Sequence, residues 1–236
     1  MTLLLGLTAG TSISQAQAQD VAFNDLDVPG DLIHPDDPDW ELQKDENGIQ
    51  VFFKKVPGSD IKAFMGKTVM SASASSILKA MQTDATCVEW IEGCVRAETL
   101  EGALFDNFYQ YGVNHLPWPA NDRDYVIHIT TSATPNNELI KLRLDAVEGI
   151  VPKTGNVRLT KMNIRYYLTP IDSSTTEMVW VQHTEPGGYI PGWLVNMLLL
   201  DIPFRSLTKL EQVANLPDYR EVEFVYDADR NIVGFE

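Results

Sequence analysis

The stretch from 183 to 210, HTEPGGYIPGWLVNMLLLDIPFRSLTKL, constrains the fold of this chain more than any other. A Pro-Gly-Gly turn at 186–188 ends an apolar strand, and Pro191 stands where the first turn of a helix begins, which suits its fixed φ and missing N–H. Apolar residues then cover more than one face of the expected helix, until Leu207 and Leu210 return to amphipathic spacing. A helix that begins apolar nearly all round must be covered there by core, a partner, lipid or an apolar ligand.

Composition and charge limit the partners of the chain. Its 236 residues, 44% of them hydrophobic, suit one large domain with a generous core. The formal net charge is −15, which argues against nucleic acid as a partner. No cluster of Lys and Arg would attract anionic lipid by charge alone, so we expect any membrane contact to be transient and to rest on apolar residues.

The N-terminus is typical of a processing signal. Leu3 to Ala9 form a short apolar core, and Ala16-Gln17-Ala18 fits a cleavage pattern, which predicts a signal peptide over 1–18 and a periplasmic or secreted protein. The first basic residue is Lys44, so either the true start lies upstream or the signal is weak. The apolar run is much shorter than the roughly 20 residues of a membrane-spanning helix.

Two acidic segments flank the central part of the chain. Residues 19–39 contain several Asp and Pro residues and are predicted to be a linker. Residues 217–236 are predicted to be a tail that either adds an edge strand or stays mobile. The domain itself is expected over 40–216.

Cys87 and Cys94 are the only cysteines. In an oxidising compartment they could close a small loop around Trp90, contributing about 2–3 kcal/mol. The alternative is two partly buried thiols without mutual contact. Two ligands are too few for a zinc site.

The remaining pattern predicts an α+β fold dominated by strands. Asn47-Gly48 indicates a tight hairpin, and Ser73 or Ser75 can cap a short helix. Three strands, this helix, about six more strands (one of them over 157–169) and the long C-terminal helix follow in order. Consecutive strands with short turns favour one antiparallel sheet of about nine strands, which curls through its twist and can grip the helix.

Three rows of alternating large residues are expected to face the helix. They enclose either an apolar pocket or a solid core, and periodicity alone does not separate the two. The rows are Phe105, Tyr109 and Tyr111, then Tyr125, Ile127 and Ile129, and finally Met162, Ile164, Tyr166 and Leu168.

Over roughly residues 40–216, the chain resembles a bacterial-type exported member of the START (StAR-related lipid-transfer) domain family. Its most specific motif is the run Pro-Gly-Gly-x-Ile-Pro-x-Trp-Leu-Val-Asn at 186–196. The other matching features occur in family order and spacing. They are Trp40, Pro57-Gly58-Ser59, Trp90, Pro117-Trp118-Pro119, Asp122-Arg123-Asp124-Tyr125 and Gly155-Asn156-Val157-Arg158.

The resemblance implies a helix-grip fold: a curved antiparallel sheet around the C-terminal helix, enclosing a tunnel for one lipid. It further implies lipid binding, and often transfer between membranes, with that helix as a lid over 190–210. The lid would contribute Trp193, Leu194, Met197 and Leu198, and the loop with Trp118 would lie at the tunnel mouth. The family's Arg-Asp pair, here Arg123 and Asp124, is interpreted as structural.

One position departs from the cholesterol-binding members of the family. They carry a buried basic residue six positions after the Arg of that pair, where this chain has Ile129. A sterol ligand therefore cannot simply be carried over from those members, although water or another side chain could take the place of the basic residue. Residues expected to line the tunnel, some near a polar head group, are Tyr109, Tyr125, Tyr166, Trp180 and Gln182.

The functional prediction is a monomer that binds one lipid (phospholipid, fatty acid, sterol or similar), without a cofactor, and transfers it between membranes. None of the usual hydrolase, metalloprotease or nucleotide-binding motifs occurs, so we do not expect an enzyme. The alternatives are a small-molecule enzyme of the helix-grip superfamily, such as a cyclase, or a ligand-sensing module without transfer.

Overall fold

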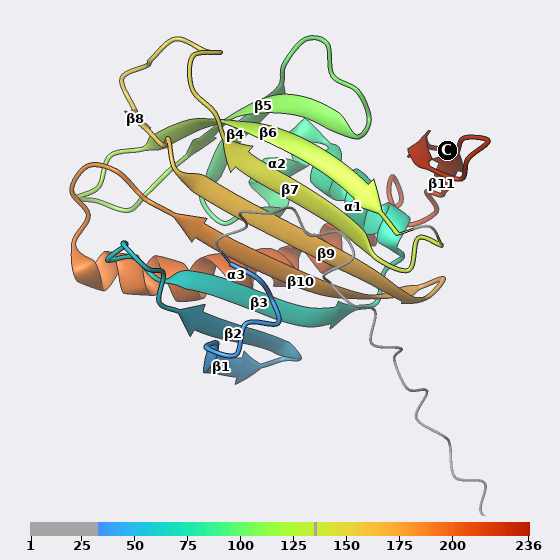
Figure 1. The fold of residues 1–236 in the computed structure, drawn as a ribbon, viewed down its shortest axis with the longest axis horizontal. Helices are drawn as coiled ribbons and strands as arrows, with labels where there is room; N and C mark the ends of the chain where they lie inside the picture. The colour runs from blue at the N-terminus through green and yellow to red at the C-terminus, as the bar shows by residue number, and fades with distance from the viewer. Residues whose placement is uncertain (1–32, 135) are drawn as a thin grey trace, which may run out of the picture.

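The computed structural model describes residues 33–134 and 136–236. A ten-stranded sheet dominates it, in the order β1-β2-β3-β10-β9-β7-β6-β5-β4, with β8 paired to β6 outside this path (Figure 1). The strands are β1 (Glu41–Glu46), β2 (Ile49–Lys54), β3 (Ala63–Met70), β4 (Cys94–Thr99), β5 (Asn107–Asn114), β6 (Arg123–Ala133), β7 (Ile140–Ala146), β8 (Val157–Arg158), β9 (Met162–Asp172) and β10 (Thr175–Thr184). The predicted signal peptide and most of the 19–39 segment lie outside the described residues.

The sheet is built from two antiparallel meanders. β1 to β3 form one of them, and β4 to β7 with β9 and β10 form the other. The last strand, β10, joins the two by pairing along β3, from Thr176 opposite Met70 to Gln182 opposite Phe64. The first hairpin turns at Asn47 and Gly48, both at positive φ (54° and 76°), as the Asn-Gly pair predicts. The α+β fold with a large antiparallel sheet and a C-terminal helix is therefore confirmed.

The predicted strand over 157–169 is wrong in one respect. The structure divides it into β8 and β9, because β8 turns away to pair in parallel with the beginning of β6, with Arg123 opposite Val157. This pairing carries Arg158 to the carboxylate of Asp124. Leu159, which is buried, follows β8 before β9 begins at Met162.

Within the described part of the chain, three α-helices and a 3₁₀ turn accompany the sheet. They are α1 (Ala74–Gln82), the 3₁₀ helix η2 (Asp84–Thr86), α2 (Cys87–Trp90) and α3 (Gly192–Ala214). Ser73 caps α1, since its hydroxyl accepts a hydrogen bond from the backbone N–H of Ser76. Figure 1 shows α3 crossing behind the sheet, on the same side as α1 and α2. Over the described ranges, every helix is too short or too polar to cross a membrane.

Apolar clusters cover both faces of the sheet. The larger one lies between the sheet and the helices and includes Tyr166, Trp180, Leu207 and Leu210. A smaller cluster on the other face contains Ile33, which is 2% exposed. The described end of the predicted linker thus packs against the sheet.

The acidic tail forms a separate hairpin of β11 (Phe224–Tyr226) and β12 (Ile232–Phe235) rather than an edge strand of the large sheet. Phe235 packs edge-on against Phe105, with ring centroids 5.1 Å apart. The hydroxyl of Ser75 donates a 2.6 Å hydrogen bond to the carbonyl of Val222. The tail is therefore attached to the domain at the end of the sheet opposite the start of α3 (Figure 1).

Candidate ligand-binding cavity

Two adjoining cavities lie between the sheet and α3. The inner compartment has a volume of about 80 Å³ and is lined by residues of α1, α2, α3 and the strands β5, β6, β7, β9 and β10. The outer compartment has a volume of about 110 Å³ and lies under the first half of α3. Both compartments share the four lining residues Asn114, Met162, Gln182 and Ile202.

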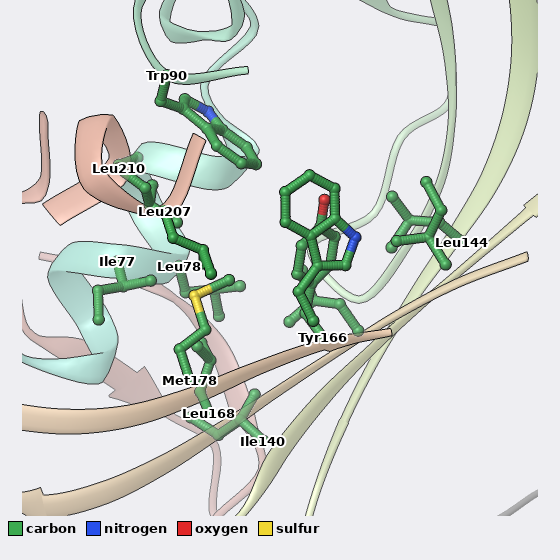
Figure 2. Close-up of a cluster of buried hydrophobic side chains, with 14 of the residues drawn as sticks. Ile77, Leu78, Trp90, Ile140, Leu144, Tyr166, Leu168, Met178, Leu207 and Leu210 are labelled. Carbon is green, nitrogen blue, oxygen red and sulfur yellow. The ribbon is translucent and has the colours of Figure 1, made fainter. Parts of the chain in front are cut away.

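Two predicted rows and the last strand meet in the inner compartment. On β9 and β10, Tyr166 lies directly opposite Trp180 across the antiparallel pair, and their ring centroids are 5.2 Å apart. Figure 2 shows Tyr166 rising from the sheet with Trp90 on one side and Leu144 on the other. The predicted residues that line this compartment are Tyr125, Ile127, Ile129, Met162, Ile164, Tyr166, Trp180 and Gln182.

The side chains of β5 that face the helices differ from those predicted. Phe108 and Gln110 line the inner compartment, whereas Tyr109 is 38% exposed and stacks on His128. Tyr111 is buried on that other side, where its hydroxyl donates to Asp124. Both faces of β5 are covered in part, so its aromatic residues do not mark the inner face.

Phe105 also lies elsewhere than expected. It precedes β5, whose first residue is Asn107, and packs against Phe235 of the tail rather than lining either compartment.

Gly112 leaves space on the inner side of β5, where it is opposite Tyr125. A Cβ at this position would lie 2.4 Å from the Tyr125 ring, so only glycine leaves room for that ring.

Of the residues predicted for the lid, two lie on the buried side of α3 and two on its exposed side. Leu198 lines the outer compartment and Leu194 is fully buried, whereas Trp193 and Met197 are exposed (60% and 38%). Trp118, in the loop before β6, is 87% exposed. The outer compartment is also lined by residues of the predicted lid and mouth loop that were not singled out, namely Leu116, Ile190, Val195, Leu199 and Ile202. Sequence reasoning missed Phe64 and Leu159, which come from distant segments.

Hydroxyl groups supply part of the polarity of the inner compartment. Burial raises the pKa of Tyr125 to about 12, and its hydroxyl donates a 3.3 Å hydrogen bond to the side-chain oxygen of Asn114. Burial, and secondarily the proximity of Tyr125, raise the pKa of Tyr166 well above its ordinary value. Both hydroxyls therefore stay protonated at neutral pH and act as hydrogen-bond donors.

The side chain of Arg123 connects the loop and the turn that border the outer compartment. Its Nε donates to the carbonyl of Pro186 at 3.1 Å and its Nη2 to that of Gly187 at 2.9 Å, while Nη1 donates to the carbonyl of Asn121. Burial lowers the pKa of Arg123. The loop before β6 and the turn before α3 are thus held to one side chain, which agrees with a structural role for this residue.

A disulfide joins Cys87 to Cys94. The loop that it closes contains Trp90, which is 2% exposed and lines the inner compartment. The centroid of the Trp90 ring system lies 6.4 Å from that of Tyr166 and also 6.4 Å from that of Trp180. The disulfide therefore constrains the segment that presents one wall of the cavity.

A sheet that curves around a C-terminal helix and encloses an apolar cavity defines a helix-grip protein. The START domain family model matches residues 21–206. The chain belongs to the START domain family.

Relatives and solved structures agree with this membership. An uncharacterized protein of Pseudomonas aeruginosa, PA1579, is 36% identical over 181 residues, which cover 75% of this chain and 87% of the relative. The STAR-related lipid transfer protein of Xanthomonas axonopodis has a similar structure (TM-score 0.68, 30% identity, 75% of this chain and 98% of that one). Human StAR-related lipid transfer protein 5 shares the fold at 17% identity (TM-score 0.67, 76% of this chain and 88% of that one).

Proposed function

We propose that this protein binds one apolar or amphipathic lipid in the cavity between the sheet and α3, and transfers it between membranes. The observation that carries the proposal is the pair of adjoining, largely apolar compartments between the sheet and α3. Membership of the START family and the similarity to a solved bacterial lipid transfer protein support it. Burying a hydrocarbon chain would stabilise the complex by about 0.8 kcal/mol per CH₂ group.

Loading a whole lipid would require the lid to move. The compartments measure about 80 and 110 Å³, whereas sites for small molecules usually begin at roughly 300 Å³. The first half of α3 supplies Val195, Leu198 and Leu199 to the outer compartment, so its displacement would enlarge the space. We therefore assign the lid to the part of α3 before Pro203.

The two halves of α3 are suited to different roles. Leu207 and Leu210, in the second half, are at most 1% exposed and belong to the core. Pro203 lies between the halves and has no N–H to bond to the carbonyl of Leu199, which weakens the helix at this junction. In our proposal the first half swings outward while the second half stays packed on the sheet.

Exposed aromatic residues at the outer compartment are proposed to contact the membrane. Trp118, Tyr189 and Trp193 are 87%, 82% and 60% exposed. Leu116 and Ile190, their near neighbours in sequence, line the outer compartment. Aromatic side chains favour the interface between lipid and water, so these rings would place the cavity mouth against the bilayer.

The chemistry of the lining favours binding over catalysis. The buried hydroxyls of Tyr125 and Tyr166 have raised pKa values, so neither serves as a base or nucleophile at neutral pH. We propose a monomeric carrier without catalytic activity. We also propose export to the periplasm or medium, in keeping with the disulfide, because disulfides persist in oxidising compartments.

A matched pair of lid variants tests the carrier function. Leu198→Asp places a charge in the outer compartment, whereas Met197→Asp places it on the exposed side of the same helix. Native mass spectrometry of the purified protein, with extraction of the bound lipid, is expected to show one lipid per monomer for the wild type and Met197→Asp but none for Leu198→Asp. Movement of the extracted lipid between vesicles should fall with Leu198→Asp.

Two outcomes would contradict this proposal. A wild-type protein that carries no lipid and binds none from a broad panel would rule out the carrier. If the wild type bound lipid but never passed it to acceptor vesicles, the protein would be a ligand-sensing module and not a carrier. Circular dichroism of both variants ensures that a lost ligand reflects the cavity and not an unfolded chain.

A further inference from the structure

The indole N–H of Trp180 is a buried donor on a residue that lines the candidate site. Trp180 is 2% exposed and lines the inner compartment. Among the described residues, nothing accepts a hydrogen bond from its Nε1. Buried donors nearly always have a partner in folded proteins, so each exception requires an explanation.

A second donor lies beside it. Tyr166 also lines the inner compartment, and the structure shows no hydrogen bond of its hydroxyl within the described part of the chain. Tyr166 and Trp180 are directly opposite each other on β9 and β10, and their rings are tilted by 36°. Two neighbouring strands thus bring two side chains with unused donors to the wall of one compartment.

The charges around these donors determine which acceptor fits. Among the residues that line the inner compartment, Glu92 alone is charged, and its carboxylate accepts a 2.6 Å hydrogen bond from Nζ of Lys209. The cation of the outer compartment, Arg123, is bonded to backbone carbonyls. A carboxylate or phosphate group of a ligand near Trp180 would therefore lose its hydration without gaining a cationic partner, which is unfavourable.

We propose that the indole N–H of Trp180 and the hydroxyl of Tyr166 form a subsite for a neutral hydrogen-bond acceptor, the carbonyl oxygen of a ketone or ester at the inward end of the ligand. This inference rests on the proposed function and narrows its ligand class. The ligand is a neutral lipid that enters carbonyl end first, and not a fatty-acid anion or an inward-facing phospholipid head group.

Three naphthalene probes of matched shape test the subsite. 2-Acetylnaphthalene carries a ketone, 2-ethylnaphthalene replaces it with a hydrocarbon group, and 2-naphthoate replaces it with an anion. Binding to the wild type, Tyr166→Phe and Trp180→Phe is measured by fluorescence titration at neutral pH. Each variant should bind the ketone about fivefold or more weakly, because its carbonyl loses a partner. Tyr166→Phe should bind the hydrocarbon with unchanged affinity, and Trp180→Phe should weaken the hydrocarbon less than the ketone. The naphthoate should bind the wild type more weakly than the ketone does.

The outcomes separate this inference from the proposed function. If no probe binds the wild type and no lipid is carried, the cavity itself fails. If the hydrocarbon binds but both variants bind the ketone as the wild type does, the subsite alone is overturned. Naphthoate binding more tightly than the ketone overturns the neutral ligand class. Tyr166→Phe keeps the ring in place, so it tests the proposal even where Trp180→Phe lowers stability.

Discussion

Gly66 on β3 and Leu207 on α3 approach each other so closely that no side chain fits between them. A Cβ added to Gly66 would lie 2.8 Å from Cδ1 of Leu207 and 3.2 Å from Cβ of Pro203. Gly66 is also the residue opposite Trp180 in the pairing of β3 with β10. The absence of a side chain at Gly66 therefore allows the anchored half of α3 to lie directly against the sheet.

Replacing Gly66 should loosen this contact. We expect Gly66→Ala to lower the free energy of unfolding by about 1–3 kcal/mol, as overpacking in a core does. Gly155→Ala is the matched control, because a Cβ there would have open space around it, and it should change stability by less than about 0.5 kcal/mol. Urea unfolding followed by tryptophan fluorescence measures both. Equal stability of the two variants would show that α3 adapts without cost.

The buried pair of Asp124 and Arg158 should make stability depend on pH. Arg158 donates to both carboxylate oxygens of Asp124, at 2.9 and 3.0 Å, and Thr154 donates at 2.7 Å. The hydrogen bonds from Arg158, opposed by burial and helped by Thr154, lower the pKa of Asp124 below its ordinary 3.8. The lowered pKa means that the stabilisation is fully present above about pH 4–5 and is lost as the pH falls through the folded-state value.

Asp124→Asn tests this pair. The variant leaves the guanidinium of Arg158 without its carboxylate, so it should lose about 3 kcal/mol of stability at pH 7. Its stability should also fall less steeply than that of the wild type below pH 4. Urea unfolding between pH 7 and pH 3 measures both effects. Parallel profiles for the two proteins would mean that Asp124 does not contribute to the acid sensitivity.

The disulfide should contribute measurably to stability. Its cysteines are 7 residues apart in sequence, and closing so short a loop restricts the unfolded chain by about 2–3 kcal/mol. The double variant Cys87→Ser, Cys94→Ser should lose this amount in urea unfolding. Adding dithiothreitol should shift the wild type by the same amount and leave the double variant unchanged. A shift in the double variant would show that the reagent acts elsewhere.

The sequence predicted the fold and most of the inner compartment because alternation is informative on strands with one consistent apolar face. On β6 and β9 the rows that include Tyr125 and Tyr166 do face the helices. On β5 the aromatic residues lie on both faces, so alternation alone assigned Tyr109 to the wrong side. Here Gly112 opposite Tyr125 decides the arrangement, and this is a contact between strands.

The lid was harder to predict than the sheet. Apolar residues surround the first half of α3, so helical periodicity does not distinguish Leu198, which lines the cavity, from Met197, which is exposed. The contact between Gly66 and Leu207 joins distant parts of the sequence and leaves no local pattern. Such positions follow only from the packing of the whole domain.

Removing the exposed rings at the cavity mouth should weaken membrane contact. Trp118 and Trp193 are 87% and 60% exposed, and half-burying such a ring in a bilayer interface should raise affinity about fivefold to tenfold. Trp118→Ala and Trp193→Ala should each lower binding to phosphatidylcholine vesicles by that factor in a flotation assay. Leu104→Ala, an exposed residue beside the C-terminal hairpin, is the control and should bind as the wild type does. Because the net charge is −15, attraction to the bilayer would be apolar, and added salt should not release the protein. Release by salt would instead indicate a charged contact and contradict the proposed docking face.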